Sequence, residues 1–446
     1  KLNRLSKLNN LNLYSQEQQA KTIKNYTKNS STNNTNNTNN ATNDNLSYLS
    51  DRVNSIKESP TFAIIALANK MKLDKKDVIV LAAGEPDFDT PQSIKEAAII
   101  AINEGKTKYT PVAGITELRQ AIKNKFYNEN NLNYAINEIL VCNGGKQAIF
   151  NAMQALLNDG DEVIIPAPFW VSYPDMVILS GGIPKIIQCN QDTEFKITPK
   201  KLQDAINART KMIILNSPNN PTGMVYSDDE LLALAAILRL HPNIYIVSDD
   251  IYEHIIFNTN SFQNIINVAP DLQSRTIVVN GVSKAYSMTG WRIGYAAISN
   301  SHIIKAMEKV QSQSTSNPCS ISQYAALKAL TDNKNDEYIK NMQNSFLKRS
   351  YYIKNAINSI EGFKCLDIQG AFYAFFDCSD IIKKLYSTNK ISMPTDLELA
   401  RFFLEEALVA MVPGSAFGLE NYMRISFATS IDELEMALTR IKNLLI

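Results

Sequence analysis

The chain has 446 residues, 45% hydrophobic and 20% charged, which is long enough for roughly two or three domains with a large core. Lys and Arg number 45 against 44 Asp and Glu, so the net charge does not indicate a nucleic-acid or membrane-surface partner. Three histidines without paired spacing and five cysteines without a C-x-x-C motif argue against a metal centre.

The segment 1–47 is dominated by Asn, Ser, Thr and Lys, a composition that predicts a disordered extension. It is poor in acidic residues and rich in hydroxyls, which would suit an organellar transit peptide; a low-complexity tail without function is the alternative. The chain begins with Lys, as expected if its native N-terminus is processed or not included. The odd number of scattered cysteines favours a reducing compartment. We therefore expect a cytoplasmic protein, or an organellar matrix protein if the extension is a transit peptide.

From Tyr48 onward apolar runs alternate with amphipathic stretches, and Gly, Pro or Asn separates them, which is typical of an α/β protein. Short apolar runs predict the strands of a mostly parallel sheet, and longer amphipathic stretches predict the helices between them. The strands are expected at Glu138–Cys142, Glu162–Ile165, Lys211–Leu215, Ile244–Ser248 and Thr276–Val279, and helices at Lys146–Leu157 and Asp228–Leu240.

This pattern predicts a large domain over residues 90–333. The remainder, 334–446, combines a long amphipathic helix, an apolar strand at Ala371–Phe376 and a closing helix from Ile431. It is expected to form a smaller α+β domain, to which the arm 48–89 contributes. No apolar stretch approaches the roughly 18 residues that a membrane span requires.

Three predicted strands are followed by polar residues of the kinds that bind ligands or take part in catalysis. A rigid Asn/Pro/Gly turn, Asn216–Gly223, follows the first, although such a segment by itself is only a turn. Asp249 and Tyr252 follow the second, and Lys284 follows the third. A lysine beside a buried strand is unusual, and open parallel sheets bind ligands at the carboxyl ends of their strands. These residues are therefore the candidate site.

The ordered set of motifs resembles the class I, fold-type I pyridoxal-phosphate aminotransferases, and most closely the bacterial-type aspartate aminotransferases. The resemblance runs from about Tyr48 to Ile446. It implies a large domain with a mostly parallel seven-stranded sheet, a smaller α+β domain, and a homodimer with shared active sites. Besides the strand-end residues, the matching segments are Ala83–Phe88, Lys108–Pro111, Asn143–Ala148 and Ala167–Tyr173.

The resemblance implies that Lys284 forms a Schiff base with pyridoxal 5'-phosphate and then moves a proton from the substrate α-carbon, in a ping-pong transamination. Asp249 would keep the cofactor's ring nitrogen protonated by charge pairing. Tyr252 and Asn220 would donate hydrogen bonds to the ring's phenolic oxygen, and Trp170 would stack on the ring.

The cofactor phosphate calls for backbone N–H groups, a hydroxyl and a guanidinium. The family's residues for this role correspond to Gly144, Gly145, Ser283 and Arg292 in this sequence. Tyr109 would reach the phosphate from the neighbouring subunit, which is why the resemblance implies a dimer.

For the substrate, Arg424 corresponds to the family's arginine for the α-carboxylate, and Gly84 would add a backbone contact. Lys146 corresponds to the lysine that binds the distal carboxylate in the most similar relatives, and it also borders the cofactor. Trp170 and Asn220 border both ligands. Lys57 and Thr61 lie on a segment that would close over the substrate or belong to the solvated surface.

The fold alone does not select a substrate, because alanine, aromatic, prephenate and kynurenine aminotransferases share it with some lyases. Lys146 favours a dicarboxylate, since an apolar substrate would leave its ammonium unpaired; aspartate with 2-oxoglutarate is therefore the expected pair, with prephenate as an alternative. A transcription regulator that senses the cofactor is a further alternative. The extension lacks helix-turn-helix periodicity, so nucleic acid is not expected as a partner. A membrane is not expected as a partner either, because no apolar stretch is long enough to span one.

Overall fold

The computed structural model describes residues 48–56, 60–257 and 262–445, with the side chains of the second segment described from residue 63 onward. The chain divides into two compact units, residues 1–54 and 55–446. In the first unit, α2 (Asp51–Asn54) is the described helix. The predictions for residues 1–47, for Lys57 and for the side chain of Thr61 fall outside the described residues. The elements below belong to the second unit.

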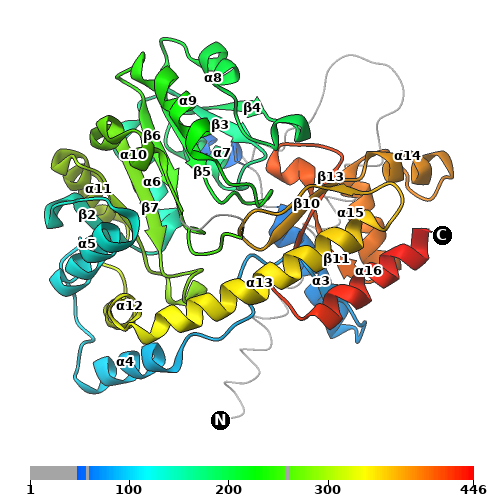
Figure 1. The fold of residues 1–446 in the computed structure, drawn as a ribbon, viewed down its shortest axis with the longest axis horizontal. Coiled ribbons are helices and arrows are strands. Elements are labelled where there is room, and N and C mark those ends of the chain that lie inside the picture. Colours follow the sequence, from blue (N-terminus) through cyan, green and yellow to red (C-terminus); the bar gives the residue numbers. More distant parts are fainter. Residues whose placement is uncertain (1–47, 57–59, 258–261, 446) are drawn as a thin grey trace. The chain divides into compact units, whose positions relative to one another are not determined.

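A seven-stranded sheet forms the core of this unit, and its strand order is β2-β8-β7-β6-β5-β3-β4 (Figure 1). β8 is antiparallel to both of its neighbours, whereas the pairs from β7 to β4 are parallel. The mostly parallel sheet is thus confirmed. The strands are β2 (Ile139–Cys142), β3 (Glu162–Ala167), β4 (Ile183–Gln188), β5 (Thr210–Asn216), β6 (Tyr245–Asp249), β7 (Thr276–Gly281) and β8 (Gly294–Ala297).

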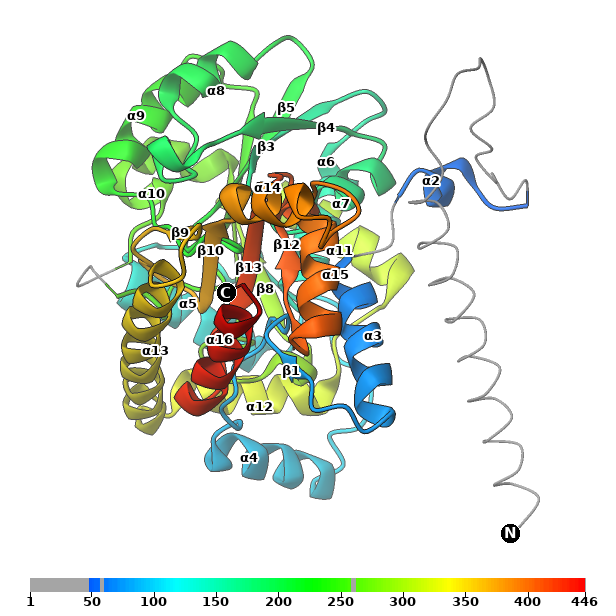
Figure 2. The ribbon, with the colours of Figure 1, turned by 90° about the vertical axis from the view of Figure 1, so that its right-hand side faces the viewer.

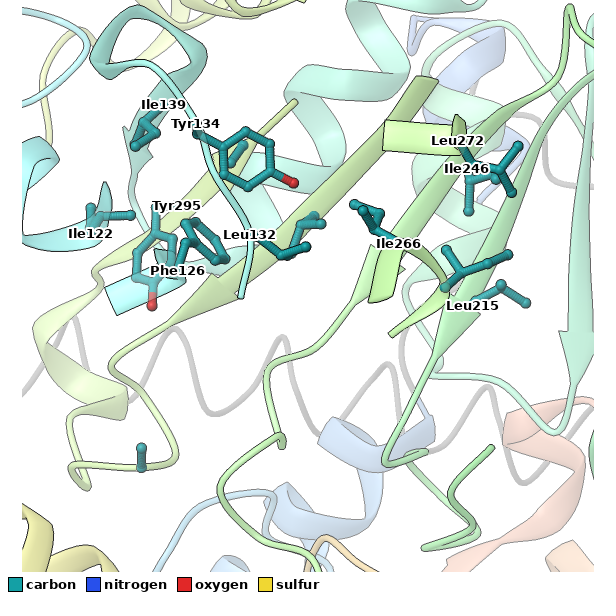
Figure 3. Close-up of a cluster of buried hydrophobic side chains, with 14 of the residues drawn as sticks. Ile122, Phe126, Leu132, Tyr134, Ile139, Leu215, Ile246, Ile266, Leu272 and Tyr295 are labelled. Carbon is teal, nitrogen blue, oxygen red and sulfur yellow. The ribbon is translucent and has the colours of Figure 1, made fainter. Parts of the chain in front are cut away.

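Helices cover both faces of the sheet because successive strand residues point to opposite sides. On β5, Ile213 and Leu215 join one buried apolar cluster, and Met212 and Ile214 join another. Figure 3 shows part of the first cluster. The first face is covered by α4 (Gln92–Asn103), α5 (Thr116–Asn130), α8 (Pro199–Ala205), α9 (Asp228–Arg239), α10 (Ile265–Val268) and α12 (Ser320–Thr331), and the second by α6 (Gly145–Leu156), α7 (Tyr173–Leu179) and α11 (Ser301–Ser314).

A second, smaller sheet has the strand order β12-β13-β10-β9 and is antiparallel throughout. The 25-residue helix α13 (Lys334–Asn358) leads from the large sheet to it and packs on β9 and β10 (Figures 1 and 2). The strands are β9 (Lys364–Cys365), β10 (Tyr373–Asp377), β12 (Val412–Pro413) and β13 (Tyr422–Ser426), and the helices beside them are α14 (Ser379–Ser387), α15 (Asp396–Glu406) and α16 (Ile431–Leu445).

The N-terminal part of the unit pairs with its C-terminal part. β1 (Ile79–Val80) is parallel to β11 (Val409–Ala410), and α3 (Pro60–Leu73) contacts β11 and β12. A segment that precedes the large sheet in the sequence therefore packs against strands of the C-terminal part. The domain boundaries predicted at residues 89/90 and 333/334 stay predictions. Short 3-10 helices complete the fold at Ile136–Glu138, Gln191–Thr193, Pro270–Arg275, Thr289–Trp291 and Gly414–Phe417.

The predicted strands and helices are confirmed within two residues at most of their ends, with β10 beginning two residues later than expected because Ala371 has a positive φ of 55°. Two strands of the seven-stranded sheet, β4 and β8, were not predicted from the sequence. β4 is an edge strand that contains Pro184 and Lys185 and whose side chains are partly or fully exposed. β8 reads Gly-Tyr-Ala-Ala, a composition of low strand propensity. Among the described helices, none is both long and apolar enough to span a membrane.

Candidate functional site

A pocket of about 450 Å³ opens at the carboxyl ends of β5, β6 and β7, where it is also bordered by residues of the smaller sheet. This is where open parallel sheets bind ligands, and the volume suits a small molecule. All of the predicted site residues except Gly144 and Tyr109 line it: Gly84, Gly145, Lys146, Trp170, Asn220, Asp249, Tyr252, Ser283, Lys284, Arg292 and Arg424.

Lys284 follows the end of β7, and its Nζ donates a 2.6 Å hydrogen bond to the backbone carbonyl of Gly84. Burial lowers the pKa of Lys284 to about 8, an effect that Arg292 and Arg424 add to and the carboxylate of Glu85 opposes. This amine therefore loses its proton more easily than an exposed lysine does, and the neutral amine is the form that attacks a carbonyl carbon or accepts a proton.

Asp249 is the last residue of β6, and its carboxylate accepts a 2.5 Å hydrogen bond from the hydroxyl of Tyr173. Burial raises the pKa of Asp249 to about 6, while the hydrogen bonds from Tyr173 and from the Ile251 N–H oppose that rise. Burial and the neighbouring carboxylate raise the pKa of Tyr173 well above its ordinary value, so its phenol keeps its proton and remains the donor. Asp249 thus offers a buried acceptor for one further N–H donor.

Tyr252 and Asn220 connect the sheet to the smaller one. The hydroxyl of Tyr252 lies 2.8 Å from that of Tyr373 on β10, and Asn220 accepts a 3.1 Å hydrogen bond from Arg424 on β13. Arg424 also donates a 2.7 Å hydrogen bond to the carbonyl of Ala82. The Nε of Arg424 is buried and makes no hydrogen bond among the described residues. Arg424 nevertheless lines the pocket, where a guanidinium suits an anionic ligand.

One corner of the pocket is built for an anion. Gly145 begins α6, so backbone N–H groups at a helix N-terminus face this corner together with Ser283 and Arg292. Arg292 is fixed by hydrogen bonds to the carbonyls of Thr289 and Asn143, of 3.0 and 3.1 Å. Gly144 has a φ of 86°, and a Cβ there would collide with the Arg292 guanidinium. Gly144 is thus next to the pocket and leaves room for the arginine.

Lys146 on α6 adds a further cation. Its Nζ lies 4.9 Å from the centroid of the Trp170 ring, and both side chains line the pocket. Burial lowers the pKa of Lys146, and the nearby charge of Arg292 acts in the same direction. Among the described acidic residues, Glu85 and Asp249 are the ones that line this pocket. The pocket therefore carries four basic side chains, Lys146, Lys284, Arg292 and Arg424, against two acidic ones, a balance suited to an anionic ligand.

The remaining predicted residue, Tyr109, does not line the pocket and is 92% exposed. It lies in the loop after α4, ahead of the turn Pro111–Gly114. A residue in this position contributes to a site only if another chain covers it. Lys57 and the Thr61 side chain are outside the described residues; from the same N-terminal arm, Ile65 of α3 lines the pocket.

A buried polar network supports the turn that carries Asp249 and Tyr252. The next residue, Glu253, is 5% exposed and forms an ion pair with the buried Lys125 of α5. Asn130 donates a 2.6 Å hydrogen bond to the same carboxylate, and His254 contacts Glu129 at 3.0 Å. Glu129, Glu253 and His254 have the spacing of metal ligands, but the Lys125 ammonium already provides the positive charge among them. The network anchors α5 to the end of β6.

Tyr173, Asn216 and Tyr373 are polar residues of this pocket for which the sequence predicted no role. Tyr173 lies in a segment that carried the family resemblance, but no role was assigned to it. Asn216 begins the predicted turn, and its side chain donates a 2.9 Å hydrogen bond to the carbonyl of Asp249. Tyr373 lies in an apolar run and reads as a core residue. The contacts of all three depend on segments that are far apart in the sequence.

Comparison with known proteins gives consistent matches. The model of the family "Aminotransferase class I and II" matches residues 76–441. An aspartate/prephenate aminotransferase of Nitrosomonas europaea is 52% identical over 397 residues, which are 89% of this chain and 99% of that protein. The solved aspartate aminotransferase of Rhizobium meliloti has 45% identity and a TM-score of 0.84, with 89% and 98% of the two chains covered. That of Thermus thermophilus, with maleate, has 41% identity and a TM-score of 0.82, with 89% and 99% covered.

Proposed function

The chain belongs to the class I and II aminotransferase family, and from this we propose that it transfers the amino group of L-aspartate to 2-oxoglutarate with pyridoxal 5'-phosphate as cofactor. The observation that carries the proposal is the placement of two cations, Arg424 and Lys146, in the pocket that contains Lys284. A dicarboxylate is bound best when each of its two carboxylates contacts a cation. The amine of Lys284, in the same pocket, would then lie near the α-carbon of the bound substrate.

The residues of the pocket fit the cofactor. A buried carboxylate, Asp249, can pair with a protonated ring nitrogen, while the α6 N-terminus, Ser283 and Arg292 suit a phosphate. Trp170 offers an aromatic face. When bound, pyridoxal phosphate supplies an aldehyde that combines with amines and a ring that accepts the electron pair left when the α-proton departs.

The chain's own groups have distinct tasks in this proposal. Lys284 would hold the cofactor through its amine and, once the substrate has replaced it, would carry the proton from the substrate's α-carbon, for which a pKa of about 8 is suitable. Asp249 would keep the ring nitrogen protonated through charge pairing, and Tyr173 restrains that carboxylate by its hydrogen bond. Tyr252 and Asn220 donate hydrogen bonds to the ring oxygen.

Specificity rests on the two cations. Arg424 is held by hydrogen bonds to Asn220 and to the carbonyl of Ala82, and it lines the pocket, where it would bind the α-carboxylate. Lys146 borders Trp170 in the same pocket and would bind the distal carboxylate. The Thermus thermophilus relative was solved with maleate, which is a dicarboxylate, and this supports the same ligand class for the present chain.

Prephenate is the second candidate, because relatives of Nitrosomonas europaea and Rickettsia felis, 52% and 50% identical, are named for it. It is also a dicarboxylate, so Lys146 and Arg424 do not separate it from oxaloacetate. Alanine and aromatic amino acids lack a distal carboxylate and would leave Lys146 unpaired. The test is kcat/KM for aspartate, prephenate, alanine and tyrosine; similar values for aspartate and alanine would overturn the dicarboxylate assignment.

We also propose a homodimer in which each pocket is completed by Tyr109 of the other chain. Two observations support it: Tyr109 is 92% exposed, and the nearby helix α4 carries Ile99, Ile100 and Ile102, each at least half exposed. A cytoplasmic or organellar-matrix location is proposed from the free state of all five cysteines. The alternative of a non-catalytic regulator does not account for the reactive environment of Lys284.

A further inference from the structure

Two phenols meet at the wall of the pocket. The hydroxyls of Tyr252 and Tyr373 are 2.8 Å apart, and their rings pack edge to face with centroids separated by 5.8 Å. Both side chains are buried, and both line the pocket. Burial raises the pKa of each phenol, so both keep their protons at neutral pH. One hydroxyl must therefore donate to the other.

The proposed function decides the direction of this hydrogen bond. If Tyr252 donates its proton to the ring oxygen of the cofactor, it has no second proton to give to Tyr373. Tyr373 must then be the donor and Tyr252 the acceptor. A phenol that accepts a hydrogen bond becomes a stronger donor, because the two bonds polarise each other.

The ring of Tyr373 has a second contact. The guanidinium carbon of Arg424 lies 4.6 Å from its centroid, which is a favourable cation–π distance. Phe417 provides another aromatic face at 4.8 Å. Tyr373 thus touches both the residue expected to bind the cofactor's ring oxygen and the residue expected to bind the substrate carboxylate.

We propose that Tyr373 is a positioning residue: its hydroxyl donates to Tyr252 and strengthens the hydrogen bond from Tyr252 to the cofactor, while its ring supports Arg424. This inference rests on the proposed function. The two contacts are separable, because Tyr373→Phe removes the hydroxyl and keeps the ring.

The first measurement is a pH titration of the visible absorbance of the cofactor-loaded protein. A hydrogen bond to the ring oxygen stabilises the deprotonated form of the bound cofactor, whose absorbance is measured. Losing that hydrogen bond therefore shifts the midpoint of the absorbance titration to higher pH. Tyr252→Phe should give the larger shift and Tyr373→Phe a smaller one in the same direction. In a Tyr252→Phe background, Tyr373→Phe should give no further shift, because there is no hydroxyl left to polarise.

Kinetics separate the two contacts of Tyr373. Tyr373→Phe should lower kcat by about twofold to tenfold, the range for one neutral hydrogen bond, and leave KM for aspartate nearly unchanged because the ring under Arg424 remains. Tyr226→Phe is the matched control. Its buried hydroxyl accepts a 3.1 Å hydrogen bond from the Ile197 N–H away from the pocket, so it should cost stability without moving the titration.

The cofactor-free protein provides a test that does not depend on the proposed function. Tyr252→Phe and Tyr373→Phe break the same hydrogen bond, so the double variant should be less destabilised than the sum of the two single variants. Additive losses would overturn the inference. So would an unshifted titration in Tyr373→Phe, or an equal shift in the Tyr252→Phe background. If instead no visible band depends on Lys284, the proposed function fails, and the unfolding cycle still decides whether the two phenols are coupled.

Discussion

The hydroxyl of Tyr173, at the start of α7, donates a 2.5 Å hydrogen bond to the carboxylate of Asp249, at the end of β6. Both groups are buried, so the carboxylate would be costly to ionise without this donor. This hydrogen bond restrains the carboxylate of Asp249. The carboxylate can still accept a hydrogen bond from a protonated nitrogen of a ligand. It ties a helix that covers one face of the sheet to the strand end on which the proposed chemistry depends.

Replacement of Asp249 tests its role most simply. We expect Asp249→Ala to retain the cofactor but to lose several orders of magnitude in kcat, because pairing with the ring nitrogen acts on the transition state more than on cofactor binding. Tyr173→Phe should lower kcat by about tenfold to hundredfold, which is the range for loss of one hydrogen bond to a charged group. Absorbance reports cofactor content, and steady-state kinetics report turnover. Near-normal turnover in Asp249→Ala would remove this residue from the mechanism.

Lys284 predicts a pH-dependent stability of the cofactor-free protein. Its folded pKa of about 8 is below its ordinary 10.5, so between these values the unfolded chain binds more protons and stability rises with pH. Below pH 8 the buried ammonium destabilises the fold by on the order of 1 to 3 kcal/mol, since water in the pocket screens part of the cost. Lys284→Met should therefore be more stable than the unaltered chain at pH 7, and the difference should shrink toward pH 10. Thermal unfolding at several pH values measures this; a difference that does not change with pH contradicts it.

The sequence was sufficient to place the strand-end residues together. Parallel strands bring their carboxyl ends to one edge, so Asp249, Lys284 and Asn220 could be grouped from their positions after predicted strands. The hydroxyl partners could not be predicted in this way. Tyr173 and Tyr373 lie among apolar residues, and their contacts depend on how a helix and a second sheet pack on the first one.

The position of Arg424 and the strand β8 could not be predicted from the hydrophobic pattern of the sequence. The guanidinium of Arg424 comes from the smaller sheet, and only the resemblance to a family placed it with the others. β8 begins at Gly294, where a Cβ would collide with the backbone of Gly144 and Gly145. Close approach of two backbone segments selects glycine there, and the pattern of apolar residues that normally identifies a strand is lost.

Substrate preference depends on Lys146 and Arg424. Arg424→Ala should reduce kcat/KM for all amino donors, since each has an α-carboxylate. Lys146→Ala should reduce kcat/KM for aspartate and glutamate by about tenfold to hundredfold, as expected for loss of a charged hydrogen bond worth roughly 1.5 to 3 kcal/mol. Alanine should be almost unaffected. Equal losses for aspartate and alanine would mean that Lys146 supports the cofactor or the fold instead.

The shared site of the proposed dimer is tested by complementation. Tyr109→Arg and Lys284→Ala should each be inactive, and mixing them under conditions that exchange subunits should restore activity in some pockets, because a hybrid dimer contains one pocket with both native residues. Tyr109→Phe, a milder change, should weaken cofactor retention. Mixed dimers without activity, despite demonstrated subunit exchange, would show that Tyr109 does not complete the neighbouring pocket.

The central claim is that Lys284 is the lysine that holds the cofactor, and it can be tested by borohydride reduction followed by peptide mapping. Lys146 and Lys284 are the two lysines that line the pocket among the described residues, so they are the two candidates. Reduction of a bond between an amine and the cofactor aldehyde leaves the cofactor permanently attached. We predict attachment at Lys284, unchanged in Lys146→Ala and lost in Lys284→Ala. Attachment at Lys146 or any other lysine would contradict the account.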